Sequence, residues 1–200
     1  MKRAILRTSL IFLLIIFAGC TSNQEHSDIK NGQGEIMKET AVIETSEGNI
    51  EVELDKEKAP ITVDNFEKYA NSGHYEGTIF HRVIKGFMMQ GGGFTPDGKQ
   101  KKTRAPIKLE SNNGLKNTDG TIAMARTSDP NSATSQFFIN TANNKFLDYT
   151  TNNDGYAVFG RVTKGIEIVK KIESAQTTTH GSFEDWPEKD IVIKKIYLKS

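Results

Sequence analysis

The sequence predicts a mainly β domain that folds as a closed antiparallel β-barrel with two α-helices. Short apolar runs of strand length recur from about residue 41 to residue 198, and Gly- and Asn-rich loops separate them. Two further segments have the apolar spacing of helices. Because closing a sheet into a barrel removes its exposed edges, a barrel is the arrangement that best accommodates many short strands in one domain.

The first two predicted strands form a hairpin. Ile50, Val52 and Leu54 alternate with acidic residues, and an apolar pair at 42–43 precedes the turn at 46–49. Alternation with a period of two is typical of a strand with one buried and one solvated face. We therefore expect these two segments to pair as antiparallel strands.

A helix is predicted directly after the hairpin. Pro60 stands at its head, where a missing backbone N–H costs least, and Gly73 follows residues 61–71 as a stop signal. Within this segment the apolar residues recur at helical spacing, at Val63, Phe66, Tyr69 and Ala70.

The rest of the chain supplies further strands and a second helix. Residues 164–172 are predicted as a short helix with Ile166, Val169 and Ile172 on one side. Five apolar runs are predicted as strands, at 79–83, 121–125, 136–140, 156–162 and 191–198.

Size and composition limit the classes of function. A chain of 200 residues is long enough for one domain with a sizeable core but short for two. Hydrophobic residues make up 36% and charged residues 26%, which is typical of a globular body. The formal net charge of +1 does not favour nucleic acid as a partner. A monomer is the default expectation.

The first residues predict export from the cytoplasm. Residues 1–7 carry three positive charges, and residues 9–18 are almost wholly apolar. This run is shorter than the ~20 residues that a membrane-spanning helix needs. A basic start, a short apolar stretch and small residues before a cleavage point are typical of a signal peptide, which we predict over residues 1–19.

Cys20 is the single cysteine of the chain and follows Ala18 and Gly19. This segment resembles the bacterial lipobox, in which the cysteine is acylated and becomes the mature N-terminus. The alternative is a secretory signal that is cut elsewhere, with the cysteine discarded. Residues 20–39 are polar and predict a flexible tether. We expect a protein outside the cytoplasm, anchored by lipid to a bacterial membrane.

Three blocks of sequence carry a resemblance to a known family. Residues 80–92 read Phe-His-Arg-Val-Ile-Lys-Gly-Phe-Met-Met-Gln-Gly-Gly. The second block joins residues 123–126 to 135–140, and the third joins 146–148 to 156–160. In content, order and approximate spacing they resemble the cyclophilins, a family of peptidyl-prolyl cis-trans isomerases. The resemblance runs from about residue 41 to residue 200.

This resemblance implies a closed eight-stranded antiparallel β-barrel capped by two α-helices over residues 40–200, with a proline-binding groove on its outer face. Arg82 would be the catalytic cation, and Gln90, together with Gln136, would orient Arg82 and the peptide backbone. Arg126 would bind the substrate through its backbone. The other substrate-binding residues that it implies are His81, Phe87, Met88, Ala125, Phe138, Phe146, Leu147 and Tyr156.

The chemistry of this reaction fits those residue types. Rotation about an X–Pro bond is slow because amide resonance gives a barrier of about 18–20 kcal/mol. No bond breaks, so neither a nucleophile, a metal ion nor a cofactor is needed. A guanidinium beside the proline nitrogen would stabilise the twisted amide more than the planar one. The 4 histidines lack metal-ligand spacing.

Simpler interpretations stand beside these. An arginine between apolar strand residues is usually a surface charge, and the apolar pocket residues could be core. Phe137 and Phe138 are adjacent on a predicted strand and face opposite sides, and only the resemblance assigns Phe138 to the groove. His81 is expected to be structural, since isomerisation transfers no proton. The alternative function is a non-catalytic chaperone or adhesin that binds proline-containing polypeptides at the cell surface.

Three positions depart from the pattern of many relatives in the family. Phe146 stands where many eukaryotic cyclophilins carry a groove tryptophan, so an indole N–H donor is missing and we expect weak binding of cyclosporin-type macrocycles. Tyr156 falls near the place of a groove histidine, and Arg126 near that of an asparagine. Both choices are similar to those of the bacterial branch of the family.

Overall fold

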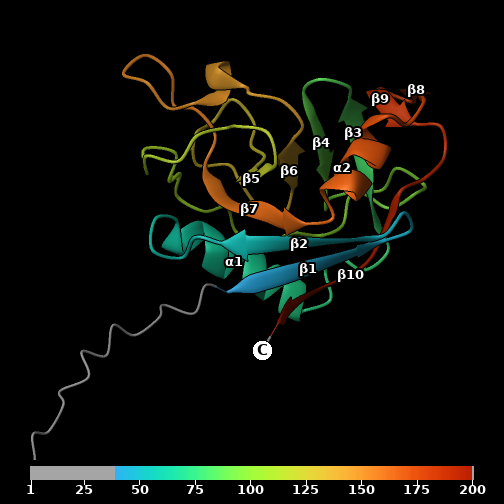
Figure 1. Ribbon diagram of the computed structural model, residues 1–200, viewed down its shortest axis with the longest axis horizontal. Helices are drawn as coiled ribbons and strands as arrows, with labels where there is room; N and C mark the ends of the chain where they lie inside the picture. The colour runs from blue at the N-terminus through green and yellow to red at the C-terminus, as the bar shows by residue number, and fades with distance from the viewer. Residues whose placement is uncertain (1–38, 200) are drawn as a thin grey trace, which may run out of the picture. The chain divides into compact units, whose positions relative to one another are not determined.

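The structure is a computed structural model that describes residues 39–199, which Figure 1 draws in colour. The predicted signal peptide at 1–19, the predicted lipid site at Cys20 and the predicted tether up to residue 38 lie outside the described residues. In the part of the chain that is described, no helix has the length and apolar character needed to cross a membrane.

Eight antiparallel strands close into a barrel, which confirms the predicted fold class (Figure 1). Their order around the barrel is β1-β10-β3-β4-β6-β5-β7-β2, and β2 pairs with β1 to close it. The barrel strands are β1 (Thr40–Thr45), β2 (Asn49–Leu54), β3 (Thr78–Ile84), β4 (Met88–Gly91), β5 (Thr121–Met124), β6 (Phe137–Asn140), β7 (Val158–Lys164) and β10 (Val192–Lys199).

The predicted hairpin is β1 and β2. Ile43 lies opposite Ile50, and both side chains are buried inside the barrel. The Thr45 hydroxyl oxygen accepts hydrogen bonds from the backbone N–H groups of Glu47 (3.0 Å) and Gly48 (3.1 Å), which fixes the turn. A Cβ at Gly48 would lie 2.6 Å from Ile168, so the turn needs glycine in order to approach the second helix.

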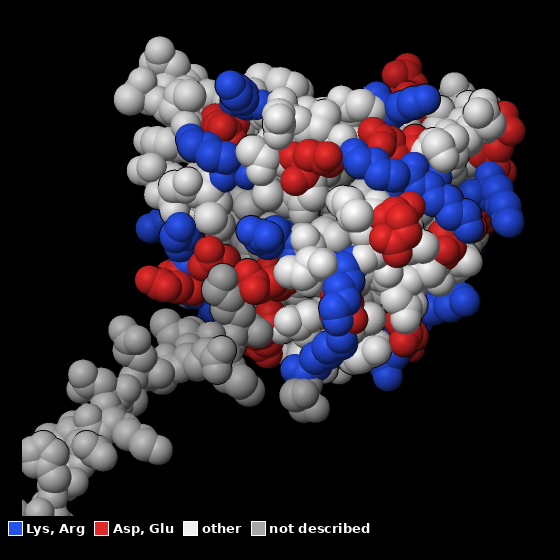
Figure 2. All heavy atoms as spheres, viewed as in Figure 1, with Lys and Arg blue, Asp and Glu red and all other residues white. Residues whose placement is uncertain are grey.

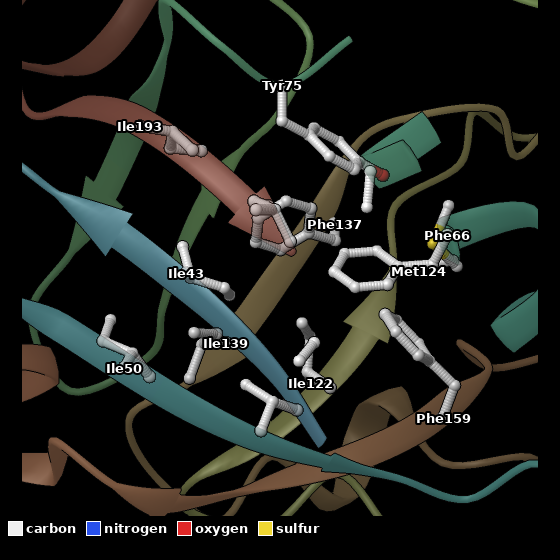
Figure 3. Close-up of a cluster of buried hydrophobic side chains, with 14 of the residues drawn as sticks. Ile43, Ile50, Phe66, Tyr75, Ile122, Met124, Phe137, Ile139, Phe159 and Ile193 are labelled. Carbon is white, nitrogen blue, oxygen red and sulfur yellow. The ribbon is translucent and has the colours of Figure 1, made fainter. Parts of the chain in front are cut away.

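The barrel interior is a single apolar core built from the inward-facing residues of the strands. Figure 3 shows Ile43, Ile50, Ile122 and Ile139 pointing toward one another from different strands. Phe66 enters this core from α1 (Pro60–Asn71) and packs edge-on against Phe137, with ring centroids 5.6 Å apart. Full burial of one such side chain stabilises the fold by about 1.5–3 kcal/mol.

The two helices cover opposite ends of the barrel. β2 begins beside α2 (Ile166–Glu173), where Glu47 pairs with Lys171 at 2.8 Å, and it ends at Leu54, from which the chain turns into α1. Val169 and Ile172 of α2 are buried whereas Ile166 is 43% exposed, so the prediction that all three lie on one side of the helix was wrong. Side chains three residues apart on a helix differ by about 60° in direction around the helix axis. Ile166 and Ile172 are two such intervals apart, so they differ by about 120° and do not face one surface together.

A second hairpin lies outside the barrel and was not predicted. It consists of β8 (Thr177–His180) and β9 (Phe183–Pro187), which Figure 1 shows beside β3. β4 was also not predicted as a separate strand.

On the face drawn in Figure 2, basic side chains are interspersed with acidic ones, as the net charge of +1 leads one to expect.

Candidate active site

The predicted site residues are held by the register of four neighbouring strands. Arg82 on β3 lies opposite Gln90 on β4, Gln90 lies opposite Phe138 on β6, and Phe138 lies opposite Ala123 on β5. Facing residues of adjacent strands point to the same side of a sheet. These four positions therefore form one row across the outer face of the barrel.

An irregularity in β3 directs Arg82 outward. Phe80 and Val83 both point into the barrel core, although they are three residues apart and simple alternation would put them on opposite faces. The register of β3 against β4 shifts between Phe80 and Arg82. A bulge of this kind is a common way to re-aim a side chain next to an active site. As a result, both His81 and Arg82 lie on the outer side of the strand.

A small hollow of about 130 Å³ opens beside this row. We call it the slot. Its lining contains only residues that the sequence predicted for the site: Arg82, Phe87, Met88, Gln90, Ala125, Arg126, Phe138, Leu147 and Tyr156.

The floor of the slot is apolar and separate from the barrel core. Phe138 and Met88 belong to a second cluster of buried residues with Leu147, whereas Phe137 belongs to the barrel core. The two adjacent phenylalanines thus face opposite sides of β6, as expected. Tyr156 packs edge-on against Phe138 with ring centroids 5.6 Å apart, which closes one side of the slot.

The other side of the slot is polar. The Gln90 amide Nε2 donates a hydrogen bond to the Gln136 Oε1 at 2.8 Å. Gln136 in turn lies against Gly93, where an added Cβ would be 2.5 Å from the glutamine Cγ. Arg82 is 44% exposed, and its Nε lies 3.6 Å from the Asp185 carboxylate. The guanidinium is therefore at the mouth of the slot and accessible to a bound peptide.

Arg126 is fixed by three interactions of its side chain. Its Nε donates to the Gly155 carbonyl at 3.0 Å, and its Nη1 donates to the Thr127 carbonyl at 2.8 Å. Its guanidinium also lies over the Tyr156 ring, 4.7 Å from the centroid, at a distance typical of a cation–π contact. These contacts thus hold the Arg126 guanidinium against the loop beside the slot.

Three buried asparagines support the loops that carry Phe87 and Leu147, and sequence reasoning missed them. Asn144 Nδ2 donates to the Phe87 carbonyl at 2.8 Å and to Asn140 Oδ1 at 2.7 Å. Asn117 Nδ2 donates to the Leu147 carbonyl at 3.0 Å. Because buried amides are costly unless they are hydrogen-bonded, such a set fixes the loop positions tightly. The sequence signal was the abundance of asparagines in the predicted loops, which holds Asn117 and Asn144 but also fits ordinary turns, whereas Asn140 ends a predicted strand.

A larger hollow of about 720 Å³ adjoins the slot, and we call it the outer hollow. It shares Arg82, Gln90, Ala125 and Arg126 with the slot. Gln136 and His81 also line it, and its far wall is the β8–β9 hairpin, through residues 182–185. A chain that filled the slot could therefore continue past the hairpin.

His81 is buried beneath the outer hollow. Its ring packs against Phe94 at 4.7 Å and near Trp186 at 6.2 Å. Burial, with a smaller effect from the Arg82 charge, lowers the pKa of His81 from 6.5 to about 4. The imidazole is therefore neutral near pH 7, in accord with a structural role.

Phe146 lines neither hollow. It is 65% exposed on the short 3-10 helix η1 (Lys145–Leu147), and its ring lies 5.5 Å from that of Phe87. Among the predicted binding residues it is the one at the outermost rim.

The described domain is similar to known proteins. Residues 40–198 match the family model described as cyclophilin type peptidyl-prolyl cis-trans isomerase/CLD. The chain is 58% identical over 153 residues to peptidyl-prolyl cis-trans isomerase A of Dickeya dadantii, covering 76% of this chain and 80% of the relative. It is 50% identical over 155 residues to peptidyl-prolyl cis-trans isomerase B of Escherichia coli, covering 76% of this chain and 94% of the relative.

A solved structure is also similar. It is a cyclophilin type peptidyl-prolyl cis-trans isomerase of Cryptosporidium parvum, crystallised in the presence of the dipeptide Ala-Pro. The TM-score is 0.67 at 30% sequence identity, and the match covers 80% of this chain and 99% of that one.

Proposed function

The chain belongs to the cyclophilin-type peptidyl-prolyl cis-trans isomerases, and from that premise we propose that it accelerates X–Pro bond rotation in exported polypeptides outside the cytoplasm, with Arg82 as its catalytic cation. The observation that carries the assignment of Arg82 is its position. Its guanidinium lies at the mouth of the apolar slot and in register with Gln90.

The reaction needs a charge that favours the twisted amide. In the planar amide the nitrogen lone pair is conjugated with the carbonyl, and uncatalysed exchange takes about 10–100 s. In the twisted state the nitrogen regains its lone pair and becomes a hydrogen-bond acceptor. An N–H donor of Arg82 stabilises this state more than the planar one, and such differential stabilisation is what lowers the barrier.

The apolar floor of the slot holds the proline ring. Phe138, Met88 and Leu147 offer surface to the pyrrolidine while excluding water, which would otherwise favour the polar planar amide. The hydrogen-bonded pair Gln90–Gln136 lies at the polar edge, where it orients Arg82 and the peptide backbone. The Arg126 backbone binds the chain beside the proline.

The test is turnover of a proline peptide by the full chain and by Arg82→Ala. Loss of one donor to a transition state costs about 100- to 1,000-fold in turnover, so we expect a fall of that size. Arg161→Ala is the matched control, because Arg161 is also a strand arginine but is exposed on β7 away from the slot. Equal rates for wild type and Arg82→Ala would refute the assignment.

The site of action is proposed from the sequence. A basic segment, a short apolar run and Cys20 at the end of a lipobox-like sequence support export and attachment to a bacterial membrane by lipid. Two acyl chains on one cysteine would give stable anchoring, whereas a single chain binds only marginally.

This anchor is tested in cells by comparing wild type with Cys20→Ser. We expect wild type to incorporate labelled palmitate and to partition into detergent. The serine variant should do neither. Absence of label from wild type would instead support a secretory signal that is cut elsewhere, and equal label in the variant would show that Cys20 is not the acylated residue.

A further inference from the structure

One acidic side chain of the β8–β9 hairpin reaches the predicted catalytic cation. The Oδ2 of Asp185 lies 3.6 Å from the Nε of Arg82, too far for a hydrogen bond but within the range of an ion pair. The two side chains are 37% and 44% exposed, so each is half-buried at the edge of the outer hollow. Among residues 39–199, Asp185 is the acidic group that pairs with this arginine.

The backbone at Asp185 is unusual. Its φ of +57° makes it the one non-glycine residue with positive φ in the described part of the chain. A left-handed conformation is unfavourable for most residues, and Asp and Asn tolerate it better than others. Backbone strain of this kind persists where the surroundings hold it, and it often marks a functional position.

Aromatic contacts hold the hairpin against β3 on both sides of Asp185. The rings of Phe183 and the buried Trp186 lie 6.4 Å and 6.2 Å from the ring of His81 on β3, and Phe183 also packs on Phe94 at 4.9 Å. His81, the neighbour of Arg82, lies under the same cluster. The carboxylate is therefore placed by packing rather than by a mobile loop tip.

We propose that Asp185 is a positioning residue for the isomerase reaction, which holds the Arg82 guanidinium at the mouth of the slot. The ion pair engages Nε, and the two terminal NH2 groups of the guanidinium remain as donors to the substrate. A long, half-exposed arginine samples many rotamers, and a fixed negative charge reduces that number before the peptide binds. This inference rests on the proposed role of Arg82.

The experiment measures kcat and KM of the full chain and its Asp185→Asn variant. Asparagine keeps the size of the side chain and tolerates the left-handed backbone, so the hairpin should fold as before. Because exposed ion pairs are weak, we expect kcat to fall about two- to fivefold with KM unchanged. The Arg82 Nε–H group should also become more mobile in the variant, which nitrogen-15 relaxation measures.

Two controls separate a positioning role from a structural one. Glu188→Gln removes one negative charge just beyond β9 and outside both hollows, and it should leave kcat unchanged. In the Arg82→Ala background, Asp185→Asn should have no further effect, because residues that act through one another are not additive.

The outcomes distinguish this inference from the proposed function. If Arg82→Ala is inactive but Asp185→Asn has wild-type kcat or a higher one, Asp185 does not position the arginine. The same holds if Asp185→Asn lowers the residual rate of Arg82→Ala further. If Arg82→Ala keeps full activity, the proposed role of Arg82 fails first, and the inference about Asp185 falls with it.

Discussion

The slot and the outer hollow share four lining residues but are built in different ways. The slot rests on barrel strands whose register places Arg82, Gln90 and Phe138 in one row, and buried asparagines fix its loops. The outer hollow takes its far wall from a hairpin that packs on His81 of β3 through Phe183 and Trp186 rather than through the barrel ladder. The proposed site for the proline ring is thus part of the barrel, whereas the far wall of the outer hollow is an addition to it.

The largest expected effect is that of acid on stability, and acid should open the outer hollow before it affects the slot. The pKa of His81 is about 4 in the fold and 6.5 as a free group, so protonation favours the unfolded or opened state. Its contribution to stability is fully present above pH 6.5 and is lost as the pH falls toward 4, with no further loss below. The shift corresponds to about 3 kcal/mol. Denaturant unfolding at several pH values, with His81→Phe as the comparison, measures it.

The hairpin itself can be followed during this titration. Trp186 is the single tryptophan of the chain and is buried on β9, so its fluorescence reports on the hairpin. We expect the Trp186 signal of wild type to change at a higher pH than activity does, and His81→Phe to lack this early change. A simultaneous change of both signals would show that the slot and the outer hollow open as one unit.

The second largest effect is expected at the asparagines that fix the slot. Asn144→Ala removes the donor to the Phe87 carbonyl and leaves the buried Asn140 Oδ1 without that partner. Loss of a buried hydrogen bond of this kind costs about 1–3 kcal/mol. We expect lower stability and a raised KM for proline peptides. Asn143→Ala, at the exposed neighbouring position, should change both by much less.

Sequence reasoning predicted the residues of the slot far better than those of the outer hollow. The physical reason is that local sequence patterns specify the elements around the slot. Ile50, Val52 and Leu54 alternate, and α1 has a proline start and a glycine stop, so local chemistry already specifies these elements. The slot residues lie in recognisable blocks. Their roles were implied by resemblance, and the row that joins Arg82 to Phe138 follows from a register that pattern does not reveal.

The hairpin was missed because its strands lack apolar alternation. Residues 177–180 are all exposed, and Gly181 at φ +60° makes the turn. β-Branched threonines before a glycine and aromatic residues after it are compatible with a hairpin, but such a segment is equally typical of a surface loop. Its docking depends on His81 and Phe94, which are distant in sequence. The bulge at His81 was also invisible, because one extra residue in a strand leaves no compositional mark.

A smaller effect is expected at the polar edge that both hollows share. In the Gly93→Ala variant the new Cβ would lie 2.5 Å from the Gln136 Cγ. The glutamine must therefore move, and we expect its hydrogen bond to Gln90 to be lost. We expect kcat/KM to fall about tenfold, equivalent to ~1.4 kcal/mol. In a Gln136→Ala background the clash is absent, and Gly93→Ala should then add nothing. A further loss in that background would mean that Gly93 acts on the backbone of β4 instead.

The smallest effect is expected at the rim of the slot, where Phe146 is 65% exposed and offers no N–H donor. Phe146→Trp restores a donor at this position, and one additional hydrogen bond is worth about 0.5–1.5 kcal/mol. We therefore expect cyclosporin-type macrocycles to bind about two- to tenfold more tightly to the variant. Proline-peptide turnover should stay within about twofold, because Phe146 lines neither hollow. Inhibition curves for both proteins measure this, and tight inhibition of wild type would show that the missing donor does not limit macrocycle binding.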